Sequence, residues 1–179
     1  MTKQHSLKIK DGTVWRDGIL FKQFEDGVGA ELSTKLYREF CPAYPKFFKM
    51  DSLSRLGFVA VELLMQVVGE EFNKEKVALI LTTNDGCLEV DERFDESRQT
   101  LASPALFVYT LPNIVAGEIC IRNGFKGEQM LFVASEMDQE FNTIYLKSLF
   151  SKGHNEAAIV GFLNAYYDKI ECDLTWIIP

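Results

Sequence analysis

The strongest constraint on the fold is an alternation of short apolar runs with longer segments of helical periodicity. Continuous apolar runs of this length are typical of strands that are covered on both faces of a sheet. The predicted strands cover residues 77–82, 130–135, 157–164 and 172–178. The predicted helices cover residues 52–69, 112–123 and 138–152. Strands that alternate with helices imply βαβ units, so the sequence predicts an α/β fold with a mostly parallel sheet of about five strands covered by helices.

Capping residues mark the ends of these helices. Asp51 or Ser52 can accept hydrogen bonds from the first N–H groups of one helix, and Asp138 can do the same for another. Gly124 and Gly153 stand where two helices are expected to end, because glycine adopts the left-handed conformation of a C-cap readily.

The remaining segments are less regular. Residues 7–9 and 18–21 flank a polar turn at Asp11-Gly12, which predicts a short hairpin. Residues 41–50 contain two prolines and exposed-looking aromatic residues, so we predict a loop there. Residues 82–110 are predicted to be a long connection, with turns at Asn84-Asp85-Gly86 and Ser103-Pro104.

Composition describes an ordinary acidic globular domain. Nineteen Lys and Arg against 26 Asp and Glu give 19 − 26 = −7, and 47% of the residues are hydrophobic. We expect residues 1–179 to form one domain, with an extension at 1–50 and a βαβ core at 51–179. The acidic balance argues against nucleic acid and anionic membranes as partners, because both attract basic patches. No apolar run approaches the roughly 20 residues of a membrane span, and the N-terminus lacks a signal-peptide core. We therefore expect no membrane insertion and a cytoplasmic location.

Residues with reactive side chains are few and scattered. The four cysteines, Cys41, Cys87, Cys120 and Cys172, form no CxxC pair. With only two histidines, His5 and His154, no zinc site can be assembled, so we expect structural thiols, no metal and no cofactor. The chain also contains no dinucleotide-binding, P-loop or nucleophile-elbow motif. These patterns alone indicate an α/β domain of unknown activity.

A set of short motifs does resemble one family. The matching segments are 49–55, 101–107, 111–119, 124–127 and 158–161. The motif positions are Ser103, Pro104, Pro112, Asn113, Gly117, Gly124, Gly127, Gly153 and Gly161. In their order and spacing they resemble the N-terminal half of the β-ketoacyl-acyl carrier protein synthases, which belong to the thiolase-like superfamily. The resemblance covers residues 47–167 and implies a thiolase-like half-fold.

The physical properties of these motif residues agree with the resemblance. Gly117 lacks bulk, so another backbone can approach its helix closely. Asn113 stands at a helix start, where its side chain can satisfy a free backbone group. Gly124 and Gly127 permit a tight entry into the next strand.

The chain departs from the family at the catalytic positions. Counting back from Gly153 and Gly161 places Glu136 where the synthases have their nucleophilic cysteine. A glutamate cannot form the acyl thioester, although it suits a helix N-terminus electrostatically. The resemblance also implies two further catalytic groups, histidines or a histidine and an asparagine, in a C-terminal half that has no counterpart before Pro179.

The helix expected at 138–152 reads as an amphipathic surface helix rather than a buried central one. Its predicted apolar face consists of Met137, Phe141, Ile144, Tyr145 and Leu149. Its predicted polar face consists of Glu140, Thr143, Lys147 and Ser151. The sequence therefore looks adapted to stand as a half-fold.

The resemblance implies a catalytically inactive accessory protein of fatty-acid or polyketide-type synthesis, such as a pigment pathway. The family's chain length factors show that loss of the cysteine is compatible with such a role. Two alternatives remain: an acyltransferase or decarboxylase that uses Glu136, and a stand-alone acyl-binding module.

The expected partners follow from one strand and from the resemblance. The 130–135 strand carries no charge, proline or glycine in its apolar stretch and lies at the sheet edge in the family, so we expect it to pair across a dimer axis. The alternative is that the segment before residue 50, with Pro42 and Pro45, folds over this edge and keeps the protein monomeric. The partner would be a second copy or a full-length ketosynthase, with an acyl carrier protein as a further candidate. We also expect Glu136 in the first turn of a helix, directly after a buried strand.

Overall fold

The computed structural model describes residues 2–25, 29–69 and 71–179, and the structural statements that follow refer to these residues. The strands are β1 (Thr2–Lys10), β2 (Thr13–Arg16), β3 (Ile19–Gln23), β4 (Val77–Thr83), β5 (Gln129–Val133), β6 (Ala157–Tyr166) and β7 (Lys169–Ile178). The α-helices are α1 (Gly29–Phe40), α2 (Ser52–Val68), α3 (Leu88–Arg98), α4 (Pro104–Tyr109), α5 (Ile114–Asn123) and α6 (Gln139–Ser151). Two 3₁₀ turns, η1 (Pro45–Lys49) and η2 (Lys74–Lys76), complete the elements.

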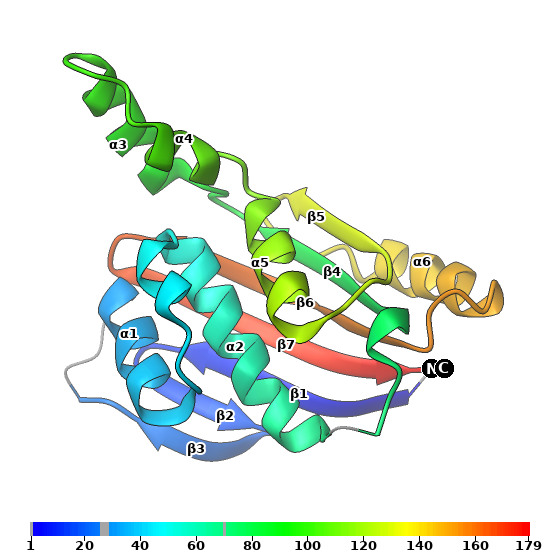
Figure 1. Cartoon of the computed structure of the whole chain (residues 1–179). Helices are drawn as coiled ribbons and strands as arrows, with labels where there is room; N and C mark the ends of the chain where they lie inside the picture. The colour runs from blue at the N-terminus through cyan, green and yellow to red at the C-terminus, as the bar shows by residue number, and fades with distance from the viewer. Residues whose placement is uncertain (1, 26–28, 70) are drawn as a thin grey trace.

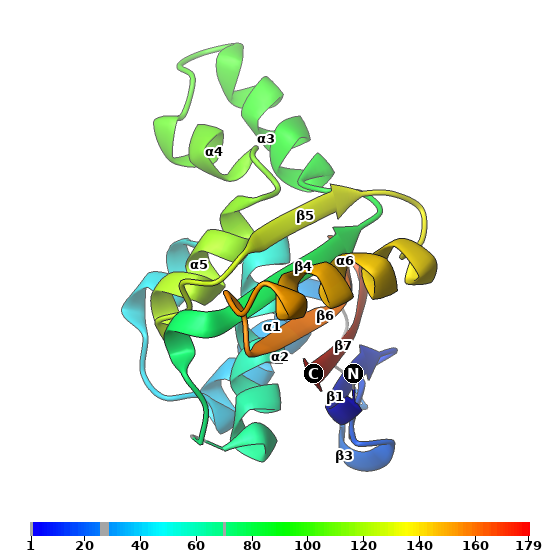
Figure 2. The same ribbon diagram turned by 90° about the vertical axis from the view of Figure 1, so that its right-hand side faces the viewer.

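The described strands form one seven-stranded sheet in the order β3-β2-β1-β7-β6-β4-β5. The α/β fold class is confirmed, and the three apolar runs near 77–82, 130–135 and 157–164 form β4, β5 and β6. β4 pairs in parallel with both β5 and β6, as the βαβ pattern predicts. Helices α1, α2 and α5 lie on one face of the sheet and α6 lies on the other, as Figures 1 and 2 show.

The sheet is mixed rather than mostly parallel, and the prediction of about five strands was wrong. The pairings of β6 with β7, β7 with β1, β1 with β2 and β2 with β3 are all antiparallel. The hairpin expected around Asp11-Gly12 is present as β1–β2, and β3 adds a further strand. Because β1 pairs with β7 along its length, residues 2–23 extend the same sheet. A sequence pattern shows which segments are strands but not which distant strand they join.

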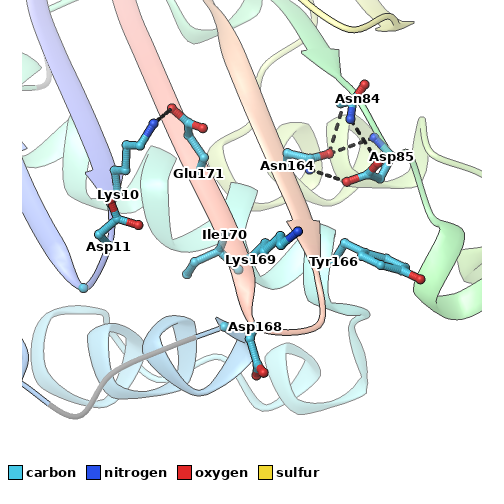
Figure 3. Close-up of a pocket in the computed structure, with 12 residues that line it drawn as sticks. Lys10, Asp11, Asn84, Asp85, Asn164, Tyr166, Asp168, Lys169, Ile170 and Glu171 are labelled. Carbon is cyan, nitrogen blue, oxygen red and sulfur yellow. Dashed lines mark hydrogen bonds and ion pairs between the residues drawn. The ribbon is translucent and has the colours of Figure 1, made fainter.

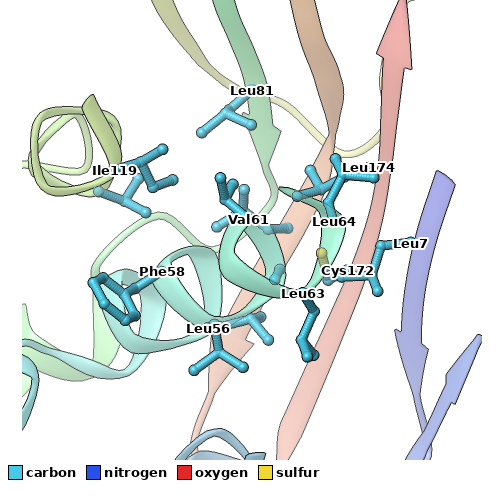
Figure 4. Close-up of a cluster of buried hydrophobic side chains, with 14 of the residues drawn as sticks. Leu7, Leu56, Phe58, Val61, Leu63, Leu64, Leu81, Ile119, Cys172 and Leu174 are labelled. Carbon is cyan, nitrogen blue, oxygen red and sulfur yellow. The ribbon is translucent and has the colours of Figure 1, made fainter. Parts of the chain in front are cut away.

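Helices α1, α2 and α5 cover one face of the sheet and enclose the main core (Figure 4). Helix α2 begins at the predicted cap, where the Asp51 carboxylate accepts hydrogen bonds from the backbone N–H groups of Leu53 and Ser54, both at 3.2 Å. The helix is apolar on almost every side, and Phe58 and Leu64 are among its fully buried residues. Such a helix is stable only when it is packed between other elements, as α2 is between the sheet and its neighbouring helices.

Helix α6 covers part of the opposite face. Alternate residues of β4 and β6, among them Ile80 and Val160, point to that side and pack against Leu146 and Leu149 of α6. The predicted apolar face of this helix was only partly right. Leu149 is buried and Tyr145 is partly buried, but Ile144 is 62% exposed, and Asn142 and Leu146 are buried instead.

The long connection at 82–110 folds into two helices that project from the sheet, and we call residues 88–109 the arm (Figure 1). Helix α3 buries only Val90, and α4 buries no residue. Ser103 and Pro104, predicted as a turn, are the N-cap and first residue of α4. The sequence pattern missed α3 because a helix rich in charged residues with one buried side chain has no apolar periodicity.

The 41–50 segment also differs from its prediction as a loop. Residues Pro45–Lys49 form η1, and the ring of Phe47 is fully buried and stacked on Tyr37 with 4.0 Å between centroids. The prolines limit regular helix here, but the aromatic rings still supply apolar area to the core. None of the described helices is both long enough and apolar enough to span a bilayer.

Candidate functional site

The carboxyl ends of the parallel strands carry a polar cluster (Figure 3). Asn164, near the end of β6, accepts hydrogen bonds at Oδ1 from the Thr83 hydroxyl (3.1 Å) and from the backbone N–H groups of Asn84 (3.2 Å) and Asp85 (2.9 Å). Its Nδ2 donates to the Asp85 carboxylate at 2.6 Å. These bonds satisfy the backbone where β4 ends, so the cluster holds the loop that leads into the arm.

A cavity of about 540 Å³ opens beside this cluster. Its lining is polar and of both charges, with Asp85, Asp168 and Lys169 among the residues, and Lys10 paired to Glu171 at 3.0 Å. An acyl chain needs an apolar cavity, because burial of its methylene groups supplies the binding free energy. This cavity therefore does not fit an acyl chain.

Glu136 does not lie where the sequence predicted. It occupies a bend between β5 and α6, ahead of the helix, and Asp138 takes the N-cap position with its carboxylate accepting from the Phe141 N–H at 2.8 Å. Glu136 is exposed, and no hydrogen bond found among the described residues involves its carboxylate. The strand before it is a half-exposed edge strand rather than a buried one. The prediction failed because two acidic residues compete for one helix start, and the residue with the N-cap geometry is the aspartate.

The glycine motif positions serve separate local purposes. Gly124 is the C-cap of α5 and Gly153 directly follows the C-cap of α6, with positive φ values of 74° and 68°, so both helices end where predicted. A side chain at Gly127 would collide with the Asn155 amide oxygen and the Val77 carbonyl. A side chain at Gly161 would collide with the backbone of β7. These two glycines permit close packing of the backbone.

The motif at 112–117 behaves differently from its prediction. Asn113 occupies the N-cap position of α5 but its side chain makes no capping hydrogen bond. Gly117 faces open space, so it does not admit a neighbouring backbone within the described chain. The close approach occurs instead at Gly57 of α2, which Val115 and Ile119 of α5 contact. Which glycine lies at a contact between two helices depends on the orientation of both helices, and the sequence of α5 alone does not show which of its faces packs against α2.

The four cysteines are free, and three of them are buried. Burial raises the pKa of the Cys41 thiol to about 12 and raises the pKa of Cys87, Cys120 and Cys172 as well. A thiol with a raised pKa is a poor nucleophile at neutral pH. Within the described residues, no group of three or more His, Cys, Asp or Glu side chains is placed to hold a metal ion.

Glu118 is a buried carboxylate that the sequence analysis missed. It lies on α5 with about 5% of its side chain exposed, and Lys46 of η1 pairs with it at 2.8 Å. The Tyr109 hydroxyl, at the end of α4, donates to its other oxygen at 3.1 Å. Burial and the Glu118 charge raise the pKa of Tyr109. A buried carboxylate needs such partners, so the trio joins η1, α5 and the arm.

The open edge of β5 adjoins a group of exposed apolar residues. β5 pairs only with β4, so its other edge is free in the described chain, as the sequence predicted. Its last residue, Val133, is 61% exposed and lies beside Gly86 and Pro112, at the base of the arm. Four of the further exposed apolar side chains of the arm and its base are Leu101, Phe107, Val108 and Leu111. We call Val133 and these four residues the edge surface.

Comparison with known proteins identifies the class of fold. No protein-family model and no curated protein matches the sequence. Among solved structures, the ishigamide ketosynthase/chain length factor matches with a TM-score of 0.66 at 19% identity, over 80% of this chain and 47% of that chain. The chain therefore spans about half the length of this neighbour.

Two further structures agree. The ketosynthase ApeO in complex with its chain length factor ApeC from Xenorhabdus doucetiae matches with a TM-score of 0.66 at 13% identity, over 99% of this chain and 79% of that chain. A complex of AntDE with AntF, a type II polyketide synthase acyl carrier protein with its ketosynthase, matches with a TM-score of 0.61 at 13% identity, over 85% of this chain and 61% of that chain. The chain therefore shares its fold with part of ketosynthase and chain length factor structures.

Proposed function

We propose that this protein is a non-condensing accessory subunit of fatty-acid or polyketide-type synthesis, and that it pairs through its edge surface with a full-length ketosynthase in the cytoplasm. The observation that carries the proposal is the open edge of β5, whose apolar residues stand next to exposed apolar residues of the arm. Monomeric proteins usually protect such an edge with charge, proline or a bulge. Pairing with another strand satisfies its free N–H and C=O groups.

The neighbouring structures support the choice of partner. Two of them pair a ketosynthase with a chain length factor, and a third contains a ketosynthase with its acyl carrier protein. A ketosynthase is therefore our first candidate partner, an acyl carrier protein is a second, and a second copy of this chain is the alternative for the edge surface.

The position of Glu136 supports the absence of condensation. Glu136 is exposed in a bend and has no hydrogen-bond partner among the described residues, so nothing there positions its carboxylate against a substrate. The same reasoning weighs against an acyltransferase or decarboxylase that uses Glu136. The polar lining of the 540 Å³ cavity weighs against the stand-alone acyl-binding module.

The association is tested by sedimentation velocity over a concentration series, with and without a purified full-length ketosynthase from the same genome. The wild-type chain should sediment above its own mass of 20.4 kDa when the ketosynthase is present. Val133→Lys should weaken the complex at least ten-fold, because it places a charge on the open edge. The matched control is Ile19→Lys on β3, which is similarly exposed and lies at the opposite end of the sheet from β5. A constant mass of 20.4 kDa in every mixture, or equal effects of both variants, would contradict the proposal.

Catalysis is tested separately, with malonyl- and acyl-carrier protein as substrates. The chain alone should give no condensation, and Glu136→Cys should not create it, because a thiol without proton-handling groups lacks the rest of the mechanism. Condensation by Glu136→Cys would refute the inactive-subunit proposal. Turnover by the wild-type chain that disappears in Glu136→Gln would instead establish the enzyme alternative.

A further inference from the structure

The arm meets the rest of the molecule at one narrow base. The chain enters α3 after Gly86 and leaves α4 before Pro112, and these two residues contact each other, with a Cβ on Gly86 falling 3.3 Å from the Pro112 ring. Val90 is the only buried residue of its two helices. An element with both ends at one point and little buried apolar area can pivot there, so its direction depends on a small number of contacts.

Val90, Leu106 and Tyr109 pack against the main core, and the remaining contacts are hydrogen bonds to carboxylates. Glu89 and Glu92 lie three residues apart on α3, which places them on one face of the helix. The Glu92 carboxylate accepts from the Tyr166 hydroxyl at 3.0 Å and from the Tyr167 hydroxyl at 2.7 Å. One oxygen of Glu89 accepts from the Ser52 hydroxyl at 2.9 Å and from the Tyr167 backbone N–H at 3.2 Å.

The β6–β7 turn that carries the two tyrosines is held in an unusual conformation. Tyr167 has φ of 48°, a value that costs free energy for a bulky residue. The first residue of α1, Gly29, packs directly against the backbone of Tyr167 and Asp168, and a side chain at Gly29 would collide with it. The rings of Tyr166 and Tyr167 contact each other edge to face, with centroids 4.8 Å apart. The turn is therefore rigid, and it presents two hydroxyl groups to one carboxylate.

We propose that the Tyr166-Tyr167 turn is a clasp that fixes the direction of the arm, and so prepares the edge surface for its partner. The clasp is a property of the free chain, while its effect on binding rests on the proposed function. Val133 touches the base of the arm, so the arm and the open edge of β5 form one continuous surface only when the arm is held in place. A partner that binds a fixed surface avoids the entropy cost of ordering it.

Hydrogen exchange of the free chain tests the clasp directly. The Tyr166→Phe/Tyr167→Phe double variant removes both hydroxyl donors to Glu92 and keeps the two rings. Backbone amides of residues 88–98 should then exchange roughly ten-fold faster, because hydrogen bonds to a charged group limit local opening. Tyr145→Phe is the matched control, since Tyr145 lies on α6 and stacks on Phe141 of the same helix rather than on the arm. That variant should leave the exchange of residues 88–98 unchanged.

Two results of this experiment would overturn the clasp. One is unchanged exchange of the arm in the double variant. The other is an equal rise in β4 and β6, which would report a general loss of stability rather than release of the arm.

The effect on binding is measured with the same ketosynthase and the same sedimentation assay. The double variant should bind about ten-fold more weakly than the wild type, and equal affinity would overturn the preparatory role of the clasp. If the wild-type chain binds no ketosynthase, the proposed function fails, but the exchange result still decides whether the clasp exists.

Discussion

The body of the molecule and the arm are held together by different interactions. The body is the sheet with α1, α2, α5 and α6, and its core is a continuous set of buried aliphatic and aromatic side chains. The arm buries almost no apolar residue of its own and is fastened by hydroxyl groups that donate to Glu89, Glu92 and Glu118. Apolar burial is non-directional, whereas hydrogen bonds require defined positions. The body therefore supplies most of the free energy of folding, whereas the hydrogen bonds of the arm mainly fix its direction relative to the body.

The largest expected effect is on the free energy of unfolding, when a phenylalanine of the body and one of the arm are each replaced by alanine. Phe58 is 1% exposed, and its ring packs against those of Tyr44 and Phe47. Phe58→Ala should lower the free energy of unfolding by about 3–5 kcal/mol, because it leaves a cavity in the core. Phe107→Ala on the arm should cost less than about 1 kcal/mol, because Phe107 is 57% exposed. Urea unfolding followed by circular dichroism measures both values, and similar losses would show that the arm is part of the core.

Two glycines of the body differ in the space around them, Gly127 being tightly enclosed and Gly117 open. Gly127→Ala should destabilise the protein by about 1–3 kcal/mol, because the new methyl group meets Asn155 and the Val77 carbonyl. Gly117→Ala places its methyl group in open space on α5 and should stabilise the protein by roughly 0.5–1 kcal/mol. Thermal unfolding of the two variants should shift in opposite directions. Destabilisation by Gly117→Ala would contradict the open space beside Gly117.

Removal of a helix cap from the body and from the arm should give smaller changes in the free energy of unfolding. Asp51 caps α2, and Asp51→Ala should lower the free energy of unfolding by about 0.5–2 kcal/mol. Ser103 caps α4 through a hydrogen bond from the Leu106 N–H at 3.3 Å. Ser103→Ala should change global stability by less than about 0.5 kcal/mol and instead speed hydrogen exchange within α4. A global loss from Ser103→Ala that equals the loss from Asp51→Ala would remove the distinction between the two regions.

The smallest effect is a titration at the clasp. The hydrogen bond to Glu92 raises the pKa of Tyr167 to about 12, from an ordinary value of 10.0. A raised pKa in the folded state means that this hydrogen bond stabilises the fold fully below pH 10, and that its contribution is lost as the pH rises through about 12. Ultraviolet titration should show a tyrosine with a midpoint near 12 that is absent from Tyr167→Phe. If Tyr167→Phe instead removes a tyrosine with a midpoint near pH 10, the hydrogen bond between Tyr167 and Glu92 is contradicted.

The parts of this fold that the sequence predicted are those that depend on apolar periodicity and capping. The strands β4, β5 and β6, the helices α2 and α6 and the caps Asp51 and Asp138 follow from patterns within a few residues. The parts that it missed depend on contacts between distant residues. The pairing of β1 with β7 is an example, because nothing in either strand specifies its partner.

The candidate site shows the same division. The sequence showed that β5 is an apolar strand without protective residues, whereas its place at the sheet edge was implied by the family resemblance. The clasp was not visible, since a glutamate on a charged helix and two adjacent tyrosines in a turn are each ordinary until the fold brings them within hydrogen-bond distance. The predicted conformation of Glu136 was wrong, because the motif order gives a residue's place along the chain but does not show where a helix begins.

The order of the strands has a consequence for how the protein is made. β7 is the middle strand of the sheet, although its residues, 169–178, are the latest of any strand in the sequence. Its partner β1 begins at Thr2, which lies opposite Ile178 (Figure 1). During synthesis, β1, β2 and β3 and then β4, β5 and β6 leave the ribosome before β7 does. The edges of β1 and β6 that pair with β7 therefore stay unpaired until β7 is synthesised. Such long-range pairing slows folding and leaves both edges open to aggregation meanwhile. We expect protection of these edges by a chaperone during synthesis to raise the yield of folded protein more than any single stabilising substitution.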